Sequence, residues 1–175
     1  MKHTVIIVIL TVFSSLALSA QVKLGGKLAY GSEIKSIGIG AKGIYELNDT
    51  FSLSGELLYF LGDKEESSIL GISTETKTSS IALNTDLHYN LLDDTFKVYA
   101  LGGLNFVNFS SKVTTSSTFG IGGLDVDSSG TFIGLNLGIG GLYEISDNLN
   151  LVSELKYVLG DFDQVVLSAG VLFNL

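Results

Sequence analysis

The chain has 175 residues, contains no cysteine and no proline, and carries 18 acidic residues against 10 lysines. Without cysteine it can form neither a disulfide nor a lipid-anchored N-terminus, and its net charge of −8 leaves no basic patch for nucleic acid. After residue 20 there is no run of 18 apolar residues, so transmembrane helices are excluded although 46 % of the chain is hydrophobic.

The first twenty residues have the layout of a cleaved export signal. Lys2 and His3 form a basic start, an apolar stretch follows, and small residues gather before a cleavage site expected after Ala20. The apolar stretch is shorter than the about 20 residues that a spanning helix needs. We therefore expect a signal peptide at residues 1–20 and a mature domain at residues 21–175.

Beyond the signal, hydrophobic residues alternate with polar or small ones, which is the period of a β-strand with one apolar face. In the segment 51–61 the odd positions read Phe, Leu, Gly, Leu, Tyr and Leu, whereas the even positions include Ser, Ser and Glu. No segment shows a convincing helical period. The alternation predicts eight strands, at residues 22–31, 36–47, 51–62, 79–91, 96–109, 131–145, 149–160 and 164–175.

The predicted connections differ in length. Three are short turns rich in Asp and Asn, and they follow Tyr45, Tyr89 and Tyr143. Two are long and rich in Ser, Thr and Gly, at 62–79 and 110–130, and we expect flexible loops there. These connections can rise beyond the membrane as strand extensions, because residues 72–79 still partly alternate. All short turns lie at one end and both long connections at the other, which is typical of outer-membrane barrels with short periplasmic turns. Both termini are expected at the periplasmic end.

The polar face of the predicted strands consists mostly of Gly, Ser, Ala and Asn, whereas a water-facing surface is richer in Lys and Glu. We therefore expect the polar face to line the interior and the apolar face to contact lipid. Charges in such an interior must be paired, and Lys42 and Glu56 are expected to pair across two strands. The expected lumen charge network comprises Lys27, Lys42, Glu56, Asp86, Glu154 and Lys156.

Aromatic residues on the apolar face gather near both ends of the strands, where the two lipid–water interfaces would favour them. Five are beside the short turns and four are toward the opposite end. The expected aromatic girdle comprises Tyr45, Tyr89, Tyr143, Phe51 and Phe96 at the first end, and Tyr30, Tyr59, Phe106 and Tyr157 at the second.

The last strand ends in a recognisable pattern, Ser168, Gly170, Phe173 and Leu175, with hydrophobic residues three and five positions after the glycine. It resembles the C-terminal signal by which the barrel-assembly machinery recognises unfolded outer-membrane proteins. Together with the export signal and eight strands, it makes residues 21–175 similar to the small bacterial outer-membrane β-barrel proteins. That family is often called the porin family or outer membrane protein β-barrel domain, with an OmpA/OmpX/OmpW-like plan.

The predicted fold is therefore all-β, an eight-stranded antiparallel up-and-down transmembrane β-barrel. The resemblance implies a bacterial outer-membrane location, contact with lipid and lipopolysaccharide, and assembly by the barrel-assembly machinery. It brings no catalytic residues and no cofactor onto this chain.

Chemical motifs are few. His88 is the only histidine of the expected mature chain, and we expect it in the lumen rather than in a catalytic site. The segment 125–130 resembles the opening of a calcium loop, but its twelfth position would be Asn136 rather than Glu, so no metal site is expected.

Three functions remain open from the sequence. The first is a structural or surface-interaction barrel whose long loops contact surface polysaccharide or a protein. The second is a narrow channel or carrier for small or hydrophobic solutes, since Phe60, Leu101, Val107 and Val166 make part of the lumen face apolar. The third is a soluble, secreted, lipocalin-like ligand-binding barrel.

Overall fold

The computed structural model describes residues 22–175, with gaps at 63, 70–71, 93–95, 118–123 and 162. The export signal predicted at residues 1–20 lies outside these described residues. Within the described ranges, no helix is long and apolar enough to cross a membrane.

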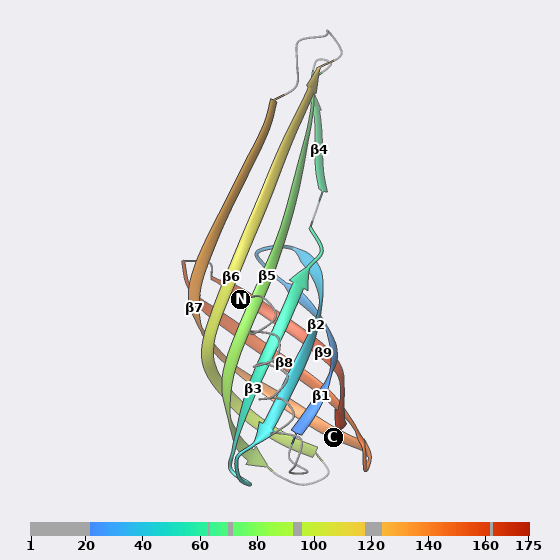
Figure 1. Cartoon of the computed structure of the whole chain (residues 1–175), viewed down its shortest axis with the longest axis vertical. Helices are drawn as coiled ribbons and strands as arrows, with labels where there is room; N and C mark the ends of the chain where they lie inside the picture. The colour runs from blue at the N-terminus through green and yellow to red at the C-terminus, as the bar shows by residue number, and fades with distance from the viewer. Residues whose placement is uncertain (1–21, 63, 70–71, 93–95, 118–123, 162) are drawn as a thin grey trace, which may run out of the picture.

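The described chain forms nine antiparallel strands in one closed sheet (Figure 1). Their order around the sheet is β3-β2-β1-β9-β8-β7-β6-β5-β4, and pairing of β3 with β5 closes it. β4 continues the line of β3 along β5, so the closed barrel is eight-stranded and the predicted fold class is confirmed. The strands are β1 (Val22–Gly31), β2 (Ser36–Glu46), β3 (Phe51–Phe60), β4 (Lys64–Ile69), β5 (Ile72–Leu92), β6 (Phe96–Ser117), β7 (Leu124–Ser146), β8 (Leu149–Gly160) and β9 (Gln164–Asn174).

The strand extensions expected at the two long connections are confirmed, whereas flexible loops were the wrong expectation for most of residues 62–79 and 110–130. β5 begins at Ile72, β6 continues to Ser117 and β7 begins at Leu124, so the described parts of both connections are largely strand. The register sets Ser and Thr opposite Ser and Thr, as at Thr78 and Ser111. Threonine favours strands, and Thr–Thr and Thr–Ser cross-strand pairs stabilise them, which explains why these polar segments stay paired.

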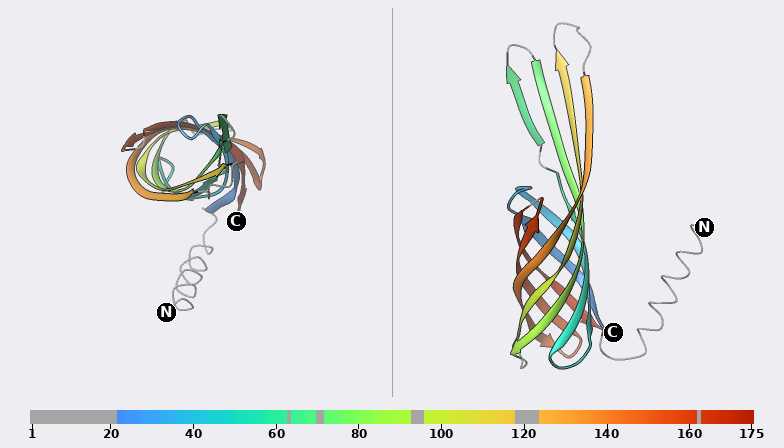
Figure 2. Two further views of the ribbon diagram at one scale, coloured as in Figure 1. Left: turned by 90° about the horizontal axis from the view of Figure 1, so that it is seen from above. Right: turned by 90° about the vertical axis from the view of Figure 1, so that its left-hand side faces the viewer.

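These extended strands form a protrusion that we call the ribbon: β4 with residues 72–79 of β5, 110–117 of β6 and 124–129 of β7. Figure 2 shows the ribbon rising well beyond the rim at which the remaining strands end. Val22 and Leu175 lie at the opposite, short-turn end, where the amide of Leu175 donates to the carbonyl of Val22 over 3.0 Å.

The short turns owe their shape to Asp and Asn. In the turn between β2 and β3, the Asn48 side-chain oxygen accepts hydrogen bonds from the backbone amides of Thr50 and Phe51, at 2.9 and 2.8 Å. Such a side chain replaces a backbone partner within a turn. The turn therefore fixes the register of the two strands that enter the barrel wall.

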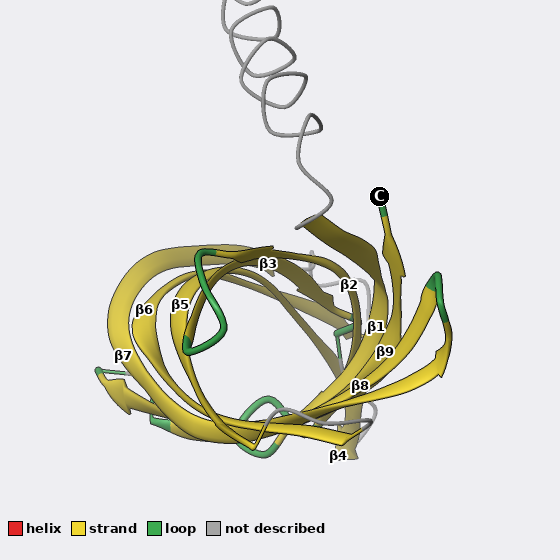
Figure 3. Ribbon diagram, turned by 90° about the horizontal axis from the view of Figure 1, so that it is seen from below, coloured by secondary structure: helices red, strands yellow, loops and turns green. Residues whose placement is uncertain are grey.

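The two faces of the sheet are inverted relative to a soluble protein. Along β3, Leu53, Leu57 and Tyr59 are exposed on the outer wall, whereas Ser54 and Glu56 are buried inside. The alternation continues around the ring seen in Figure 3. The chain thus places hydrocarbon on its outer surface and polar groups in its interior, as the sequence pattern predicted.

Large interior side chains fit because glycines face them from neighbouring strands. A Cβ at Gly140 would overlap the ring of Tyr99, and a Cβ at Gly170 would overlap the carbonyl oxygen of Gly26 and the Cα and Cβ of Lys27. An eight-stranded barrel has an interior just wide enough for side chains. Because these glycines have no side chain, Tyr99 and Lys27 have room inside the barrel.

Candidate functional site

The six residues of the expected lumen charge network lie together inside the barrel. Lys27 Nζ is 2.6 Å from both Glu56 Oε2 and Glu154 Oε2. Lys42 Nζ is 2.7 Å from Glu154 Oε1. Each lysine therefore bridges carboxylates that come from different walls of the barrel.

The other half of the network centres on Lys156. Its Nζ lies 2.9 Å from Glu56 Oε1 and 3.6 Å from Asp86 Oδ2. Three lysines thus face three carboxylates, and all six residues are at most 3 % exposed. Buried charges are tolerated when paired and hydrogen-bonded, so the network is a neutral plug rather than an isolated charge in the wall.

Asparagines extend this network toward the ribbon end. Asn105 and Asn136 both donate to the side-chain oxygen of Asn84, over 2.6 and 2.9 Å. Asn136 also donates to Asp86 over 2.7 Å, and Asn84 donates to Glu56 over 3.2 Å. The sequence analysis missed this layer, although all three asparagines fall on the polar face of predicted strands.

His88 lies in the lumen beside Tyr99. The two rings stack with centroids 4.2 Å apart and planes 8° apart, while Tyr99 donates to Glu154 Oε1 over 2.7 Å. His88 Nε2 is 2.9 Å from Ser54 Oγ. A Ser–His contact can activate a nucleophile, but both residues are only 1 % exposed, so the described structure offers a substrate no route to them.

Two apolar layers close the lumen above and below the charge network. The layer at the short-turn end consists of Ile44, Tyr99, Leu101, Leu142, Val152 and Leu172. The layer at the ribbon end consists of Ala29, Ile34, Leu58, Phe60, Ala82, Val107, Val158 and Val166, with Phe132 packed against it. The channel hypothesis rested on four apolar lumen residues. All four belong to these two layers: Phe60, Leu101, Val107 and Val166.

Ile34 contributes to the ribbon-end seal although it lies in the turn between β1 and β2. It is 6 % exposed and packs with Phe60 and Val166 in that layer. The next residue, Lys35, has a φ of 51°, a left-handed conformation that is uncommon for residues other than glycine. A four-residue turn is too short to show a period, so this inward side chain could not be predicted from the alternation.

A smaller cluster lies at the short-turn rim. Lys23 Nζ and Lys97 Nζ each approach Glu46 Oε1 to 2.9 Å, and all three side chains are partly exposed. Glu144 is exposed at the end of β7. Among the described residues, no group of three or more His, Cys, Asp or Glu side chains is placed to hold a metal ion.

The nine aromatic residues of the expected girdle lie on the outer wall, and all but the half-buried Tyr45 are exposed. Phe51 is paired with Tyr89, with ring centroids 5.5 Å apart, and Phe96 is paired with Tyr143. These pairs lie beside the short turns. The other members, Tyr30, Tyr59, Phe106 and Tyr157, stand farther along their strands toward the ribbon.

The last strand, β9, pairs with β1 on one side and β8 on the other. Within the predicted assembly signal, Ser168 faces the lumen at 3 % exposure, whereas Phe173 and Leu175 lie exposed on the outer wall. Gly170 faces Lys27 as described above. The segment 125–129, considered as a loop, is instead part of β7 and pairs with β6.

Comparison with known proteins agrees with this architecture. A family model described as outer membrane protein beta-barrel domain matches residues 5–173. No curated protein matches the chain.

Three solved structures are similar to the chain in fold. Ail, the attachment invasion locus protein of Yersinia pestis, has 18 % identity and a TM-score of 0.53, covering 87 % of this chain and 95 % of Ail. The N-terminal β-barrel domain of Pseudomonas aeruginosa OprF has 16 % identity and a TM-score of 0.57, covering 90 % and 98 %. Neisserial surface protein A has 22 % identity and a TM-score of 0.56, also covering 90 % and 98 %.

Proposed function

We propose that this chain, which belongs to the outer membrane protein beta-barrel domain family, is a non-enzymatic surface-interaction protein of the bacterial outer membrane. The ribbon carries the interaction, and the closed barrel anchors it. The observation that carries the proposal is the combination of a sealed lumen with a protrusion made of four paired strands. Among the described residues, the side chains that face the lumen are almost all buried against one another, so what remains for recognition is the ribbon.

The closed lumen argues against the channel or carrier alternative. A solute would have to cross the ribbon-end apolar layer, the charge network and the short-turn apolar layer in turn. Phe60 and Tyr99, the largest members of the two layers, are each 0 % exposed. Water-filled porins use about 16–18 strands, whereas eight strands leave room only for side chains.

The outer wall argues against the soluble lipocalin-like alternative. Leu57, Leu83 and Leu137 are each at least 50 % exposed, while Lys42, Asp86 and Glu154 are at most 1 % exposed. A protein in water would expose the charges and bury the leucines. Family membership and this inverted surface together support an integral membrane barrel.

The ribbon offers two kinds of contact. First, within the described residues, β4 pairs only with β5, and β7 pairs with β8 only from Gly134 onward, so both edges of the ribbon present backbone groups. An open strand edge can accept an extended segment of another protein. Second, the external segments are acidic, with nine carboxylates against four lysines between residues 31–36, 61–79, 110–130 and 160–164.

The negative charge of these external segments limits the kind of partner that the ribbon can bind. One structure of Ail contains the heparin analogue sucrose octasulfate, which is a polyanion. The ribbon of this chain carries Glu65, Glu66, Glu75, Asp125 and Asp127 against three lysines, so like-charge repulsion disfavours a sulfated polysaccharide. We therefore favour a protein partner with a basic surface and an extended segment over a surface polysaccharide.

A trimmed variant tests this function. Deleting residues 66–75 and 113–126 leaves Glu65–Thr76 and Lys112–Asp127 as two-residue connections, because these pairs are opposite each other in register. Cells carrying the full or trimmed chain are compared for attachment to surfaces coated with a basic protein, a neutral polysaccharide or heparin. We expect trimming to abolish attachment to the basic protein while barrel levels in the outer membrane stay equal.

A charge variant is the matched control. Replacing Glu65, Glu66 and Glu75 with glutamine keeps the length of the ribbon and removes three charges. It should weaken attachment and reduce its sensitivity to salt, since exposed charges are screened at high ionic strength. Attachment that survives trimming, or that is stronger on heparin than on the basic protein, would contradict the proposal.

The remaining assignments belong to the same proposal. Residues 1–20 act as a cleaved export signal, and Ser168, Gly170, Phe173 and Leu175 are read by the barrel-assembly machinery. Lipid and lipopolysaccharide contact the outer wall between the two aromatic rows. The ribbon then faces the outside of the cell and the termini face the periplasm.

A further inference from the structure

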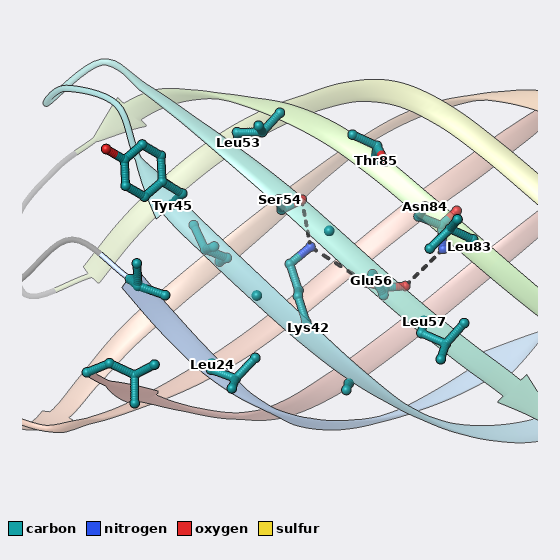
Figure 4. A pocket seen from close by; sticks show the side chains of 16 residues that line it. Leu24, Lys42, Tyr45, Leu53, Ser54, Glu56, Leu57, Leu83, Asn84 and Thr85 are labelled. Carbon is teal, nitrogen blue, oxygen red and sulfur yellow. Dashed lines mark hydrogen bonds and ion pairs between the residues drawn. The ribbon is translucent and has the colours of Figure 1, made fainter. Parts of the chain in front are cut away.

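The outer wall is not smooth. A groove with a volume of about 440 Å³ lies across β1, β2, β3 and β5 (Figure 4). Its floor consists of small residues, Ala41, Gly43, Gly55 and Thr85. Gly43 is opposite Gly55, and Gly55 is opposite Thr85, so the floor is continuous across three strands.

The groove has hydrocarbon walls and no outward charge. Leu24, Leu53, Leu57 and Leu83 stand along it, and each is at least 41 % exposed. Lys42 and Glu56 lie behind the floor, but their side chains are at most 2 % exposed and bind lumen partners. The groove therefore presents a surface that suits an alkyl chain.

The position of the groove fits one leaflet. It begins beside Tyr45 and Leu175 at the short-turn end and reaches Leu57 and Leu83 farther along the wall. With the ribbon outside the cell, this is the periplasmic half of the membrane. The groove is continuous with the lipid-facing wall of the barrel.

From this geometry we infer that the groove binds one acyl chain of a phospholipid from the periplasmic leaflet. A flexible chain can follow the floor and restore the dispersion contacts that an empty hollow loses. A second copy of the barrel fits less well, because in a two-fold dimer the same patch meets itself. A groove would then face a groove, and a void would remain between the two copies.

Two glycines allow the groove to be filled without strain. A Cβ at Gly55 would meet no atom within 4 Å, and a Cβ at Gly43 would first meet Leu24 at 3.6 Å. Gly55→Leu should therefore fold normally while occupying the space of the acyl chain. Gly102 faces outward on β6, where a Cβ would first meet Leu137 at 3.7 Å, so Gly102→Leu is a matched control away from the groove.

The natural chain contains no tryptophan, so a single introduced tryptophan is a unique fluorescent reporter. Tyr45→Trp places it at the groove, and Tyr143→Trp places it beside an equivalent short turn outside the groove. Each variant is held in detergent micelles with one phospholipid per protein, brominated on its acyl chain. We expect about three-fold stronger quenching of Tyr45→Trp, because a preferred site fills first by mass action.

Adding Gly55→Leu to Tyr45→Trp should lower its quenching to that of Tyr143→Trp, whereas adding Gly102→Leu should leave it unchanged. Native mass spectrometry of the protein extracted from membranes should show one retained phospholipid, lost in Gly55→Leu. Equal quenching of the two reporters would overturn the inference. So would a dimer that dissociates in Gly55→Leu, which would assign the groove to a second copy. Gel mobility with and without heating reports that each variant is folded.

Discussion

Lys42 on β2 is opposite Glu56 on β3, and Lys42 Nζ lies 3.6 Å from Glu56 Oε2. Each of the two residues nevertheless makes a shorter ion pair with a different partner. Lys42 is closer to Glu154, at 2.7 Å, and Glu56 is closer to Lys27, at 2.6 Å. The strand register brings the pair together, and the width of the lumen lets both reach across it. We therefore expect the whole lumen charge network, rather than the Lys42–Glu56 pair, to stabilise the barrel.

Removing one member of the network should be more harmful than removing a balanced pair. Breaking a buried ion pair costs roughly 3–5 kcal/mol because the remaining charge loses its partner. We expect Glu56→Ala to lower the free energy of unfolding more than Glu56→Ala combined with Lys42→Ala, measured by urea titration in bilayers. Simple additivity of the two single changes would count against the coupling.

Substitutions at Gly140 and Tyr99 test how tightly the side chains in the lumen are packed. A Cβ at Gly140 would overlap the Tyr99 ring, and overpacking costs roughly 1–3 kcal/mol. Gly140→Ala should therefore destabilise the barrel, and adding Tyr99→Leu should remove part of that specific penalty. The same urea titration gives the coupling energy, and Gly102→Ala, on the outer wall, is the control that should change little.

The face assignment could be predicted from the sequence because a period of two is a local property. Leu137 and Asn136 are adjacent in the chain, yet one is 54 % exposed and the other 1 % exposed. The partner of each lumen charge could not be predicted in this way. Whether Lys42 reaches Glu56 or Glu154 depends on the stagger of strands around the barrel, which no single segment encodes.

The ribbon shows a second limit of sequence reasoning. Segments rich in Ser and Thr lack the strong apolar alternation that revealed the barrel strands, so they suggested loops. Their stability comes from pairing with each other, as at Thr78 and Ser111, and such pairing becomes visible only when the partner strand is known. The inward turn residue Ile34 was missed for a different reason, because a four-residue turn is too short to show a period.

Lysine substitutions at Leu137 and Ser129 test which parts of β7 lie in the membrane. A lysine at the bilayer midplane of a barrel costs roughly 2–4 kcal/mol, so Leu137→Lys should impair folding into lipid bilayers. Ser129→Lys lies on the same strand in the ribbon and should change stability by less than about 0.5 kcal/mol. Equal effects of the two changes would place both residues in the same environment.

Cysteine labelling tests orientation. The chain contains no cysteine, so Ser128→Cys in the ribbon and Asp147→Cys in a short turn are each unique thiols at exposed positions. In intact cells, a membrane-impermeant maleimide should label Ser128→Cys at once and Asp147→Cys only after the outer membrane is permeabilised. Labelling of Asp147→Cys first would reverse the topology and remove the ribbon from the cell surface.

The closed lumen predicts that the protein does not conduct ions. The purified protein in planar bilayers should show no steady conductance, because an ion must pass two apolar layers, and such constrictions exclude water. Phe60→Ala should not open a steady path by itself, since the charge network and the layer around Tyr99 still block the axis. Phe60→Ala combined with Tyr99→Ala removes the largest side chain from each layer and should give small, brief openings at most, because the three lysines and three carboxylates remain. A large and stable conductance from the unmodified monomer would contradict the closed lumen and favour the channel alternative.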